Sequence, residues 1–133
     1  MGAPLVKRFR LEPIPLAYLI IGEHAGAAGF VGMANPIPYD KPELAAIYAL
    51  AAEYLGMRFV YLEAGSGAKQ SVPPDMVRAV KKTCRMHIIT GGGIRTPSQA
   101  RAIVDAGAEL IVTGTIAEKA SVRKLREIIR AIR

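Results

Sequence analysis

Two glycine-containing segments have the residue types that a phosphate site needs. Three glycines stand together at Gly91-Gly92-Gly93, and Gly114-Thr115 follows about 22 residues later. Glycines let the backbone approach an anion closely and turn several N–H groups toward it. The N-terminus of a following helix adds a favourable dipole. One glycine run alone would be consistent with a flexible turn, but two such segments at the ends of apolar runs predict a phosphate-binding site.

A third segment, residues 61–67, adds a carboxylate. Tyr61 and Glu63 alternate with Leu62 at the end of an apolar run, so they share one face of the predicted strand. In a barrel that face can point into the lumen, near the mouth where substrates lie. A carboxylate there is costly unless it binds something polar, which makes Glu63 the best catalytic candidate. The alternative is a structural ion pair with a Lys or Arg.

Ser66 stands between two glycines, an arrangement similar to a nucleophile elbow. A nucleophilic serine needs a base, and neither His24 nor His87 has a suitable spacing. We therefore expect Ser66 to form a hydrogen bond or to contact a phosphate.

Four β-rich runs and four helical patterns alternate along the chain and would position these residues. The runs are near-continuous in apolar residues, as expected for parallel strands covered on both faces. They are Ala17–Ile21, Phe59–Ala64, His87–Gly91 and Leu110–Thr115. Repeated βα order implies right-handed crossovers and a parallel sheet. A doubly wound sheet would fit this order too, but chemistry-bearing residues at the strand ends and glycines after the last two strands favour a (β/α)8 barrel.

The helices have recognisable ends. We expect the first from Lys41 to Leu55, with a capping box of Asp40 and Glu43, and the second after Pro73-Pro74. The third begins at Thr96, with Gln99 closing a capping box and Gly107 ending it. The last begins at Ser121. Between the first strand and helix, residues 22–40 are predicted to form a long loop, such as a lid over the site, or a disordered segment.

Composition narrows the function classes. With 133 residues the chain has about half of the roughly 250 residues of a TIM barrel. No apolar run is long enough for a transmembrane helix and no secretory signal is evident, so a cytoplasmic protein is expected. One cysteine, Cys84, and two histidines argue against disulfides and a metal cluster. Residues 69–133 hold 13 Lys/Arg and 5 Asp/Glu, but at helical spacing without aromatics, which favours a solvated helix face over nucleic-acid binding.

Taken together, four strings resemble archaeal geranylgeranylglyceryl phosphate synthases, the PcrB-like prenyltransferases. The resemblance extends from about Ile14 to the C-terminus, after a leader at residues 1–13. It is carried by NPIPYDKPELAAIYALAAEYLGM, YLEAGSGA, ITGGGIRT and IVTGTIAE at residues 35–57, 61–68, 89–96 and 111–118. The glycine motifs alone are generic to phosphate-binding barrels, whereas the combination is specific. The resemblance implies an α/β fold consisting of half of a (β/α)8 TIM barrel, namely four βα units that correspond to strands five to eight.

The resemblance also implies roles. The phosphate of sn-glycerol 1-phosphate would lie on the backbone of Gly92, Gly93, Gly114 and Thr115, with help from Ser66. Tyr61 and Glu63 would hold the glycerol hydroxyls, and Glu63 would take the proton as the glycerol C3 oxygen joins C1 of geranylgeranyl diphosphate. The complete set of expected substrate-binding residues is Tyr61, Glu63, Gly65, Ser66, Gly67, Gly91, Gly92, Gly93, Arg95, Gly114 and Thr115, with Tyr61 and Glu63 as the catalytic pair.

The half of the family that binds Mg²⁺ and the diphosphate has no counterpart in this sequence. We therefore expect no metal ligands here and a split enzyme of archaeal ether-lipid synthesis, completed by an N-terminal half-barrel subunit and assembled as a higher oligomer. Two alternatives are a non-catalytic half-barrel that binds phosphorylated ligands and homodimerises, and half of another phosphate-binding TIM-barrel enzyme.

Overall fold

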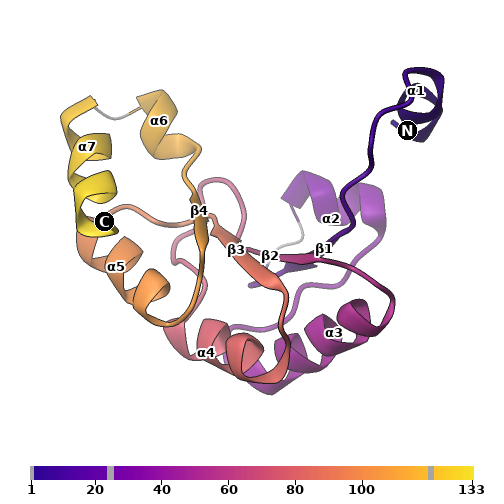
Figure 1. Cartoon of the computed structure of the whole chain (residues 1–133). Coiled ribbons are helices and arrows are strands. Elements are labelled where there is room, and N and C mark those ends of the chain that lie inside the picture. The colour runs from indigo at the N-terminus through magenta and orange to yellow at the C-terminus, as the bar shows by residue number, and fades with distance from the viewer. Residues whose placement is uncertain (1, 24–25, 120–121) are drawn as a thin grey trace.

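A computed structural model describes residues 2–23, 26–119 and 122–133. Its centre is a single parallel sheet in the order β1-β2-β3-β4 (Figure 1). The strands are β1 (Leu16–Ile20), β2 (Phe59–Glu63), β3 (His87–Gly91) and β4 (Leu110–Val112). Sequential parallel strands joined by helices are the arrangement of a barrel segment, and the predicted βα order is confirmed.

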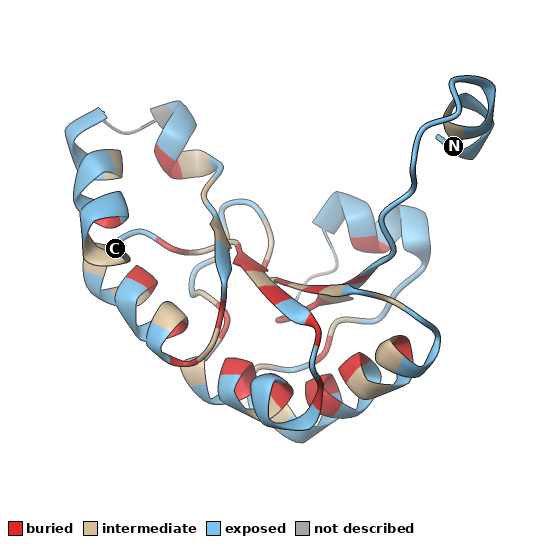
Figure 2. Cartoon of the chain, viewed as in Figure 1, coloured by how far each residue is buried: buried red, intermediate tan, exposed pale blue. Residues whose placement is uncertain are grey.

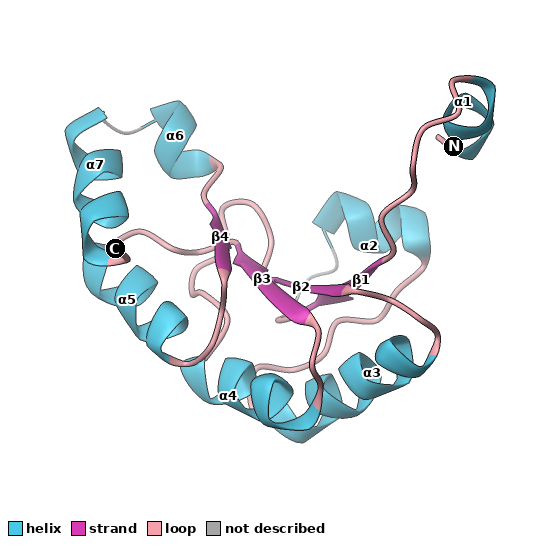
Figure 3. Ribbon diagram, viewed as in Figure 1, coloured by secondary structure: helices cyan, strands magenta, loops and turns pink. Residues whose placement is uncertain are grey.

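The four longer helices cover one face of this sheet. In Figure 3, α3 (Pro42–Tyr54), α4 (Pro74–Thr83), α5 (Pro97–Asp105) and α7 (Val122–Ala131) form a curved outer layer. Two short helices, α2 (Gly26–Gly32) and α6 (Thr115–Lys119), follow the carboxyl ends of β1 and β4. The N-terminal helix α1 (Ala3–Arg8) stands apart and has no buried residue. The helix of the predicted leader thus contributes nothing to the core.

Strand alternation separates a buried face from an open one (Figure 2). Val60, Leu62 and Ile88 point to the helices and are fully buried. On the opposite face the register places Tyr18, Tyr61, Ile89 and Leu110 side by side. Tyr18 and Leu110 keep 44% and 48% of their surface exposed. In a closed barrel this face would be the packed lumen.

The helix ends agree with the sequence at two places and differ at one. Thr96 and Gln99 form the complete capping box expected at the start of α5. Gly107, at φ +116°, follows the end of that helix, as predicted. The box expected from Asp40 and Glu43 is wrong: the N-cap is Lys41, without a side-chain cap. Because Pro42 takes the first helical position, Glu43 is at the second. A capping box needs a Glu or Gln at the third position, from which the side chain reaches back to the N-cap N–H.

Two other expectations need correction. Residues 22–40 are not a structureless loop, since they contain α2 and an isolated parallel bridge between Ile21 and Ile37. The fourth strand ends at Val112 rather than at Thr115, because the chain turns there and Thr115 begins α6. Cys84 is buried directly after α4. His24 and Ser121 lie outside the described residues.

No helix in the described ranges is both long and apolar enough to cross a bilayer.

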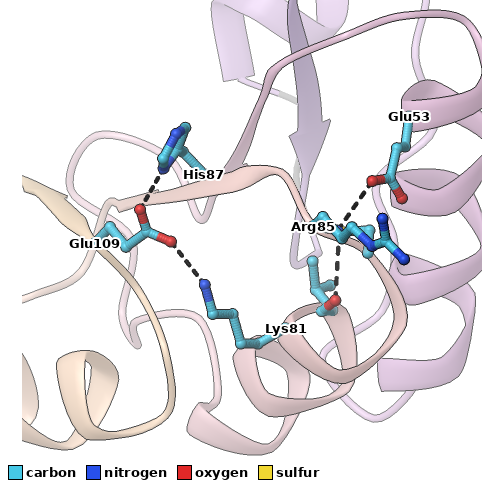
Figure 4. A network of polar contacts seen from close by, with 7 residues as sticks. Glu53, Lys81, Arg85, His87 and Glu109 are labelled. Carbon is cyan, nitrogen blue, oxygen red and sulfur yellow. Dashed lines mark hydrogen bonds and ion pairs between the residues drawn. The ribbon is translucent and has the colours of Figure 1, made fainter.

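A polar network ties the amino ends of the last two strands to α4 (Figure 4). The carboxylate of Glu109, just before β4, contacts Lys81 Nζ at 2.7 Å and His87 Nδ1 of β3. These hydrogen bonds, that from Lys81 first, lower the pKa of Glu109 below its ordinary value of 4.5. A carboxyl group whose pKa is lower in the folded than in the unfolded protein stabilises the fold at pH values above its unfolded pKa. This stabilisation is lost as the pH falls through the folded pKa.

We therefore expect Glu109→Gln to lower the free energy of unfolding at pH 7 by at most about 1 kcal/mol, because the network is partly exposed. The difference from the unsubstituted protein should shrink as the pH falls below about 4.5. Urea unfolding at several pH values measures it. Glu127→Gln, whose carboxylate lies 3.7 Å from Arg123 on α7, is the matched control. A difference that does not change with pH would contradict the role given to the ionised Glu109.

Candidate functional site

The candidate site lies at the carboxyl ends of β2, β3 and β4. Parallel strands bring these ends to one edge, so the loops that follow them meet there. They surround a cavity of about 300 Å³. It is lined by Tyr61, Glu63, Ser66, Gly67, Gly92, Gly93, Ile94, Arg95, Val112, Thr113, Gly114, Thr115 and Ile116. Nine of the eleven expected substrate-binding residues are in this lining, and the other two, Gly65 and Gly91, are their chain neighbours.

Glu63 and Tyr61 form the acidic wall of the cavity. Oε1 of Glu63 accepts a hydrogen bond of 2.8 Å from the backbone N–H of Gly65. Burial raises the pKa of Tyr61, and hydrogen bonding to Glu63 and its charge raise it further, so the phenol stays protonated. Tyr18 packs edge-on against Tyr61, with ring centroids 4.9 Å apart. Tyr61 is thus held by an aromatic neighbour on one side and the carboxylate on the other.

Gly91 creates the space for these two side chains. A Cβ at residue 91 would overlap the Tyr61 hydroxyl and would lie 2.9 Å from Oε2 of Glu63. The phenol and the carboxylate therefore both lean over the Cα of Gly91. The structure brings together the acidic pair and the glycine run, which the sequence could only place at the same edge of the sheet.

Gly92 and Gly93 allow two loops to touch through their backbones. Both have left-handed φ values, +80° and +69°. A Cβ at Gly92 would lie 2.6 Å from the amide nitrogen of Gly65, and one at Gly93 would overlap the carbonyl oxygen of Gln70. Glycine is therefore required here both by conformation and by space. The loop of residues 64–70 and the loop of residues 92–96 form one continuous wall.

Arg95 lines the cavity but directs its guanidinium at the backbone. Nη1 donates to the carbonyl oxygen of Lys69 at 2.9 Å, and Nη2 donates to that of Ala68 at 2.6 Å. Its expected contact with substrate stays a prediction, while its contacts with the loop of residues 64–70 are part of the structure.

The last strand contributes a different wall. Gly114 directly precedes α6, and Thr115 is the first residue of that helix. A Cβ at Gly114 would meet nothing within 4 Å. Sequence reasoning missed four lining residues: Ile94, Val112, Thr113 and Ile116. Ile94 and Ile116 are almost fully buried and form an apolar floor. Thr113 could have been found, because it adds a hydroxyl directly next to the predicted glycine.

A second cavity, of about 490 Å³, lies across the loop of residues 64–70. Ser66 and Gly67 line both cavities, so this loop is the wall between them. Glu23 and Tyr39 line the second cavity, and the pKa of Tyr39 is raised by burial and then by the charge of Glu23.

The described residues offer no set of three or more His, Cys, Asp or Glu side chains placed to hold a metal ion. The first cavity has one carboxylate, Glu63, and this already accepts the Gly65 N–H. The residues present do not suit Mg²⁺, and the expectation that its ligands lie elsewhere stays a prediction.

Comparison with known proteins places this geometry in a family. The profile of the PcrB family matches residues 2–132. The chain belongs to the PcrB family. The match begins before Ile14, where the resemblance was expected to start, and includes most of residues 1–13.

PcrB-family relatives agree in sequence and structure. The geranylgeranylglyceryl phosphate synthase of Thermococcus kodakarensis is 62% identical over 128 residues, which cover 96% of this chain and 50% of that protein. The enzyme of the same name from Nitrosopumilus maritimus is 55% identical, over 99% of this chain and 53% of its own length. The chain therefore spans about half the length of these relatives.

A solved structure fits the described fold closely. The (S)-3-O-geranylgeranylglyceryl phosphate synthase of Thermoplasma acidophilum, in complex with its substrate sn-glycerol-1-phosphate, superimposes with a TM-score of 0.90 at 46% identity. The alignment covers 98% of this chain and 53% of that chain. The four parallel strands correspond to half of the barrel of this PcrB-family enzyme.

We expect Gly92→Ala to lower the free energy of unfolding by about 1–3 kcal/mol, the cost of a strained left-handed residue, with a further loss from the overlap with Gly65. Gly114→Ala in the opposite wall should change it by less than about 1 kcal/mol, because the position is open and its φ is ordinary. Equilibrium urea unfolding of both variants measures this. Equal effects would show that the loop contact is not what makes residue 92 a glycine.

Proposed function

We propose that this PcrB-family chain binds sn-glycerol 1-phosphate and, with a complementary half-barrel, transfers a geranylgeranyl group to the glycerol C3 oxygen. The observation that carries the proposal is the cavity at the strand ends. It has glycine backbone on two walls and a Tyr–Glu pair on another. The name of the Thermoplasma acidophilum relative and its bound substrate support the same ligand.

The phosphate would occupy the glycine side of the cavity. Gly92 and Gly93 are held with their backbone at the cavity surface, and Gly114 and Thr115, between β4 and α6, line another part of it. Backbone N–H groups in such concavities bind anions without a side-chain charge. The hydroxyl of Ser66, on the exposed turn after β2, is suited to a further contact with the phosphate.

The glycerol would lie toward Glu63 and Tyr61. Oε1 of Glu63 is engaged by Gly65, which leaves Oε2 over Gly91 to accept a proton. As the glycerol C3 oxygen forms its bond to C1 of the prenyl group, its proton passes to Glu63. The bond from C1 to the diphosphate oxygen breaks, and the diphosphate leaves with the electron pair. Tyr61, whose protonated phenol donates to Glu63, can accept a hydrogen bond from a glycerol hydroxyl and so orient it.

The open face of the sheet supports a complementary half. Within the described residues β1 and β4 are edge strands, and the layer that contains Tyr18 and Leu110 is uncovered. Parallel sheets are found with both faces covered, and an apolar layer of this kind is stable only when it is packed. The complementary half would close the lumen and supply the prenyl-diphosphate and Mg²⁺ sites.

The first test is complementation. The chain mixed with the N-terminal half of a PcrB-family barrel should transfer prenyl groups, whereas neither part alone should do so. Glu63→Gln should lower kcat/KM by about 10²–10⁴-fold, the range for loss of a general base. Glu127→Gln, on the outer helix α7, should have no effect. An active Glu63→Gln mixture would refute the role of Glu63, and an inert mixture in which the two halves associate would refute the reaction.

The same open layer also suits pairing with a second copy, as a non-catalytic half-barrel dimer that binds phosphorylated ligands. Mass measurement of the purified chain separates the two functions. A symmetric dimer that does not exchange for the complementary half favours the binding module. A chain that forms a one-to-one complex with that half favours the enzyme.

A further inference from the structure

We propose that Arg95 is a positioning residue, which holds the loop of residues 64–70 in the shape that receives the phosphate. This inference deepens the proposed function and depends on it for the identity of the ligand. The guanidinium spans three consecutive carbonyl oxygens of that loop. Nη1 is 2.9 Å from the oxygen of Lys69, and Nη2 is 2.6 Å from that of Ala68 and 3.4 Å from that of Gly67.

The backbone of Arg95 is itself fixed. Its N–H donates to Oε1 of Gln99 at 2.8 Å, and the N–H of Thr96 donates to the same oxygen at 3.1 Å. The N–H of Gln99 donates back to Oγ1 of Thr96 at 3.2 Å. This is the capping box at the start of α5. The arginine therefore connects a glycine-rich turn to the start of a packed helix.

Apart from Arg95, the loop is held mainly at its two ends, where the Gly65 N–H donates to Oε1 of Glu63 and where Gly92 and Gly93 pack against Gly65 and Gln70. Gly65 and Gly67 both have positive φ, at +100° and +75°, and Ser66 between them is exposed. Within the loop, the Ala68 N–H donates to the Gly65 carbonyl at 3.2 Å. From outside, the Tyr39 hydroxyl reaches the Gln70 carbonyl at 3.4 Å. A glycine turn loses much conformational entropy when it is ordered, so a forked donor that binds three carbonyls lowers the cost of ligand binding.

Position 95 requires the fork of N–H donors that a guanidinium provides, and not only a positive charge. Arginine presents five N–H donors in a rigid plane, whereas lysine presents a single ammonium on a flexible stem. Among the described residues no carboxylate forms an ion pair with Arg95, whose charged guanidinium donates to backbone carbonyl oxygens at the cavity edge. Lysine would keep that charge and lose the fork, which separates positioning from simple attraction of an anion.

The test compares Arg95→Lys with Arg101→Lys. Arg101, within α5, also donates to a carbonyl, that of Ala131, but lies outside the cavity. Hydrogen exchange is measured without ligand, both on the chain alone and on the assembled barrel. Arg95→Lys should speed amide exchange in residues 65–70 of this loop by about tenfold or more, because local opening becomes easier. Arg101→Lys should leave that segment unchanged.

In the assembled barrel, Arg95→Lys should raise the KM for sn-glycerol 1-phosphate by about tenfold and leave the KM for the prenyl diphosphate unchanged, a split that a general loss of stability would not produce. Arg95→Gln, which also removes the charge, should have a larger effect. If Arg95→Lys weakens binding while loop exchange stays as in the unsubstituted protein, Arg95 contacts the substrate directly and the inference is wrong. If neither the unsubstituted protein nor any variant binds sn-glycerol 1-phosphate, the proposed function is wrong. The hydrogen-exchange result then still decides whether Arg95 holds the loop of residues 64–70.

Discussion

The backbone contact between two loops is the constraint on which the candidate site depends. Gly92 and Gly93 lie so close to Gly65 and Gln70 that no side chain fits between them. This contact sets the distance from the glycine run on β3 to the acidic pair on β2, and so the width of the cavity. The parallel register brings the strands into line, with Glu63 opposite Gly91, but the register alone would leave the two loops free to separate.

The open face of the sheet is the second constraint, and it links folding to function. The helices bury one side of the sheet in a continuous apolar core. On the other side no described helix packs on the layer of Tyr18, Tyr61, Ile89 and Leu110, and the next residue of β2 on that face is Glu63. The apolar layer that would be buried in a closed barrel is thus directly beneath the candidate catalytic carboxylate. Covering that layer would also remove water from around Glu63, which strengthens its interactions with a bound hydroxyl.

Much of this arrangement could be predicted from the sequence, because its signals are local. Near-continuous apolar runs marked the strands, Thr96 and Gln99 marked the start of a helix, and glycines at strand ends marked the cavity. The errors occurred where a neighbour decided the outcome. Pro42 moved the start of α3 by one position, and β4 ended at Val112, so that Thr115 became helical. The direction of the Arg95 side chain could not be predicted, since its acceptors lie about 27 residues away in the chain and become neighbours only in the folded sheet. Ile94 and Ile116 were missed because apolar residues carry no chemical signal of a site.

The network of Glu109, Lys81 and His87 has a consequence for how such a protein can change. It joins the amino ends of β3 and β4 to α4, a whole strand length from the cavity at the carboxyl ends. Substitutions that adapt the chain to another temperature or acidity can therefore accumulate at one end of the sheet while the geometry at the other end is preserved. A designer could use the same separation. New ion pairs could strengthen the amino ends of the strands, while substitutions around the cavity at the carboxyl ends adapt it to a different phosphorylated acceptor.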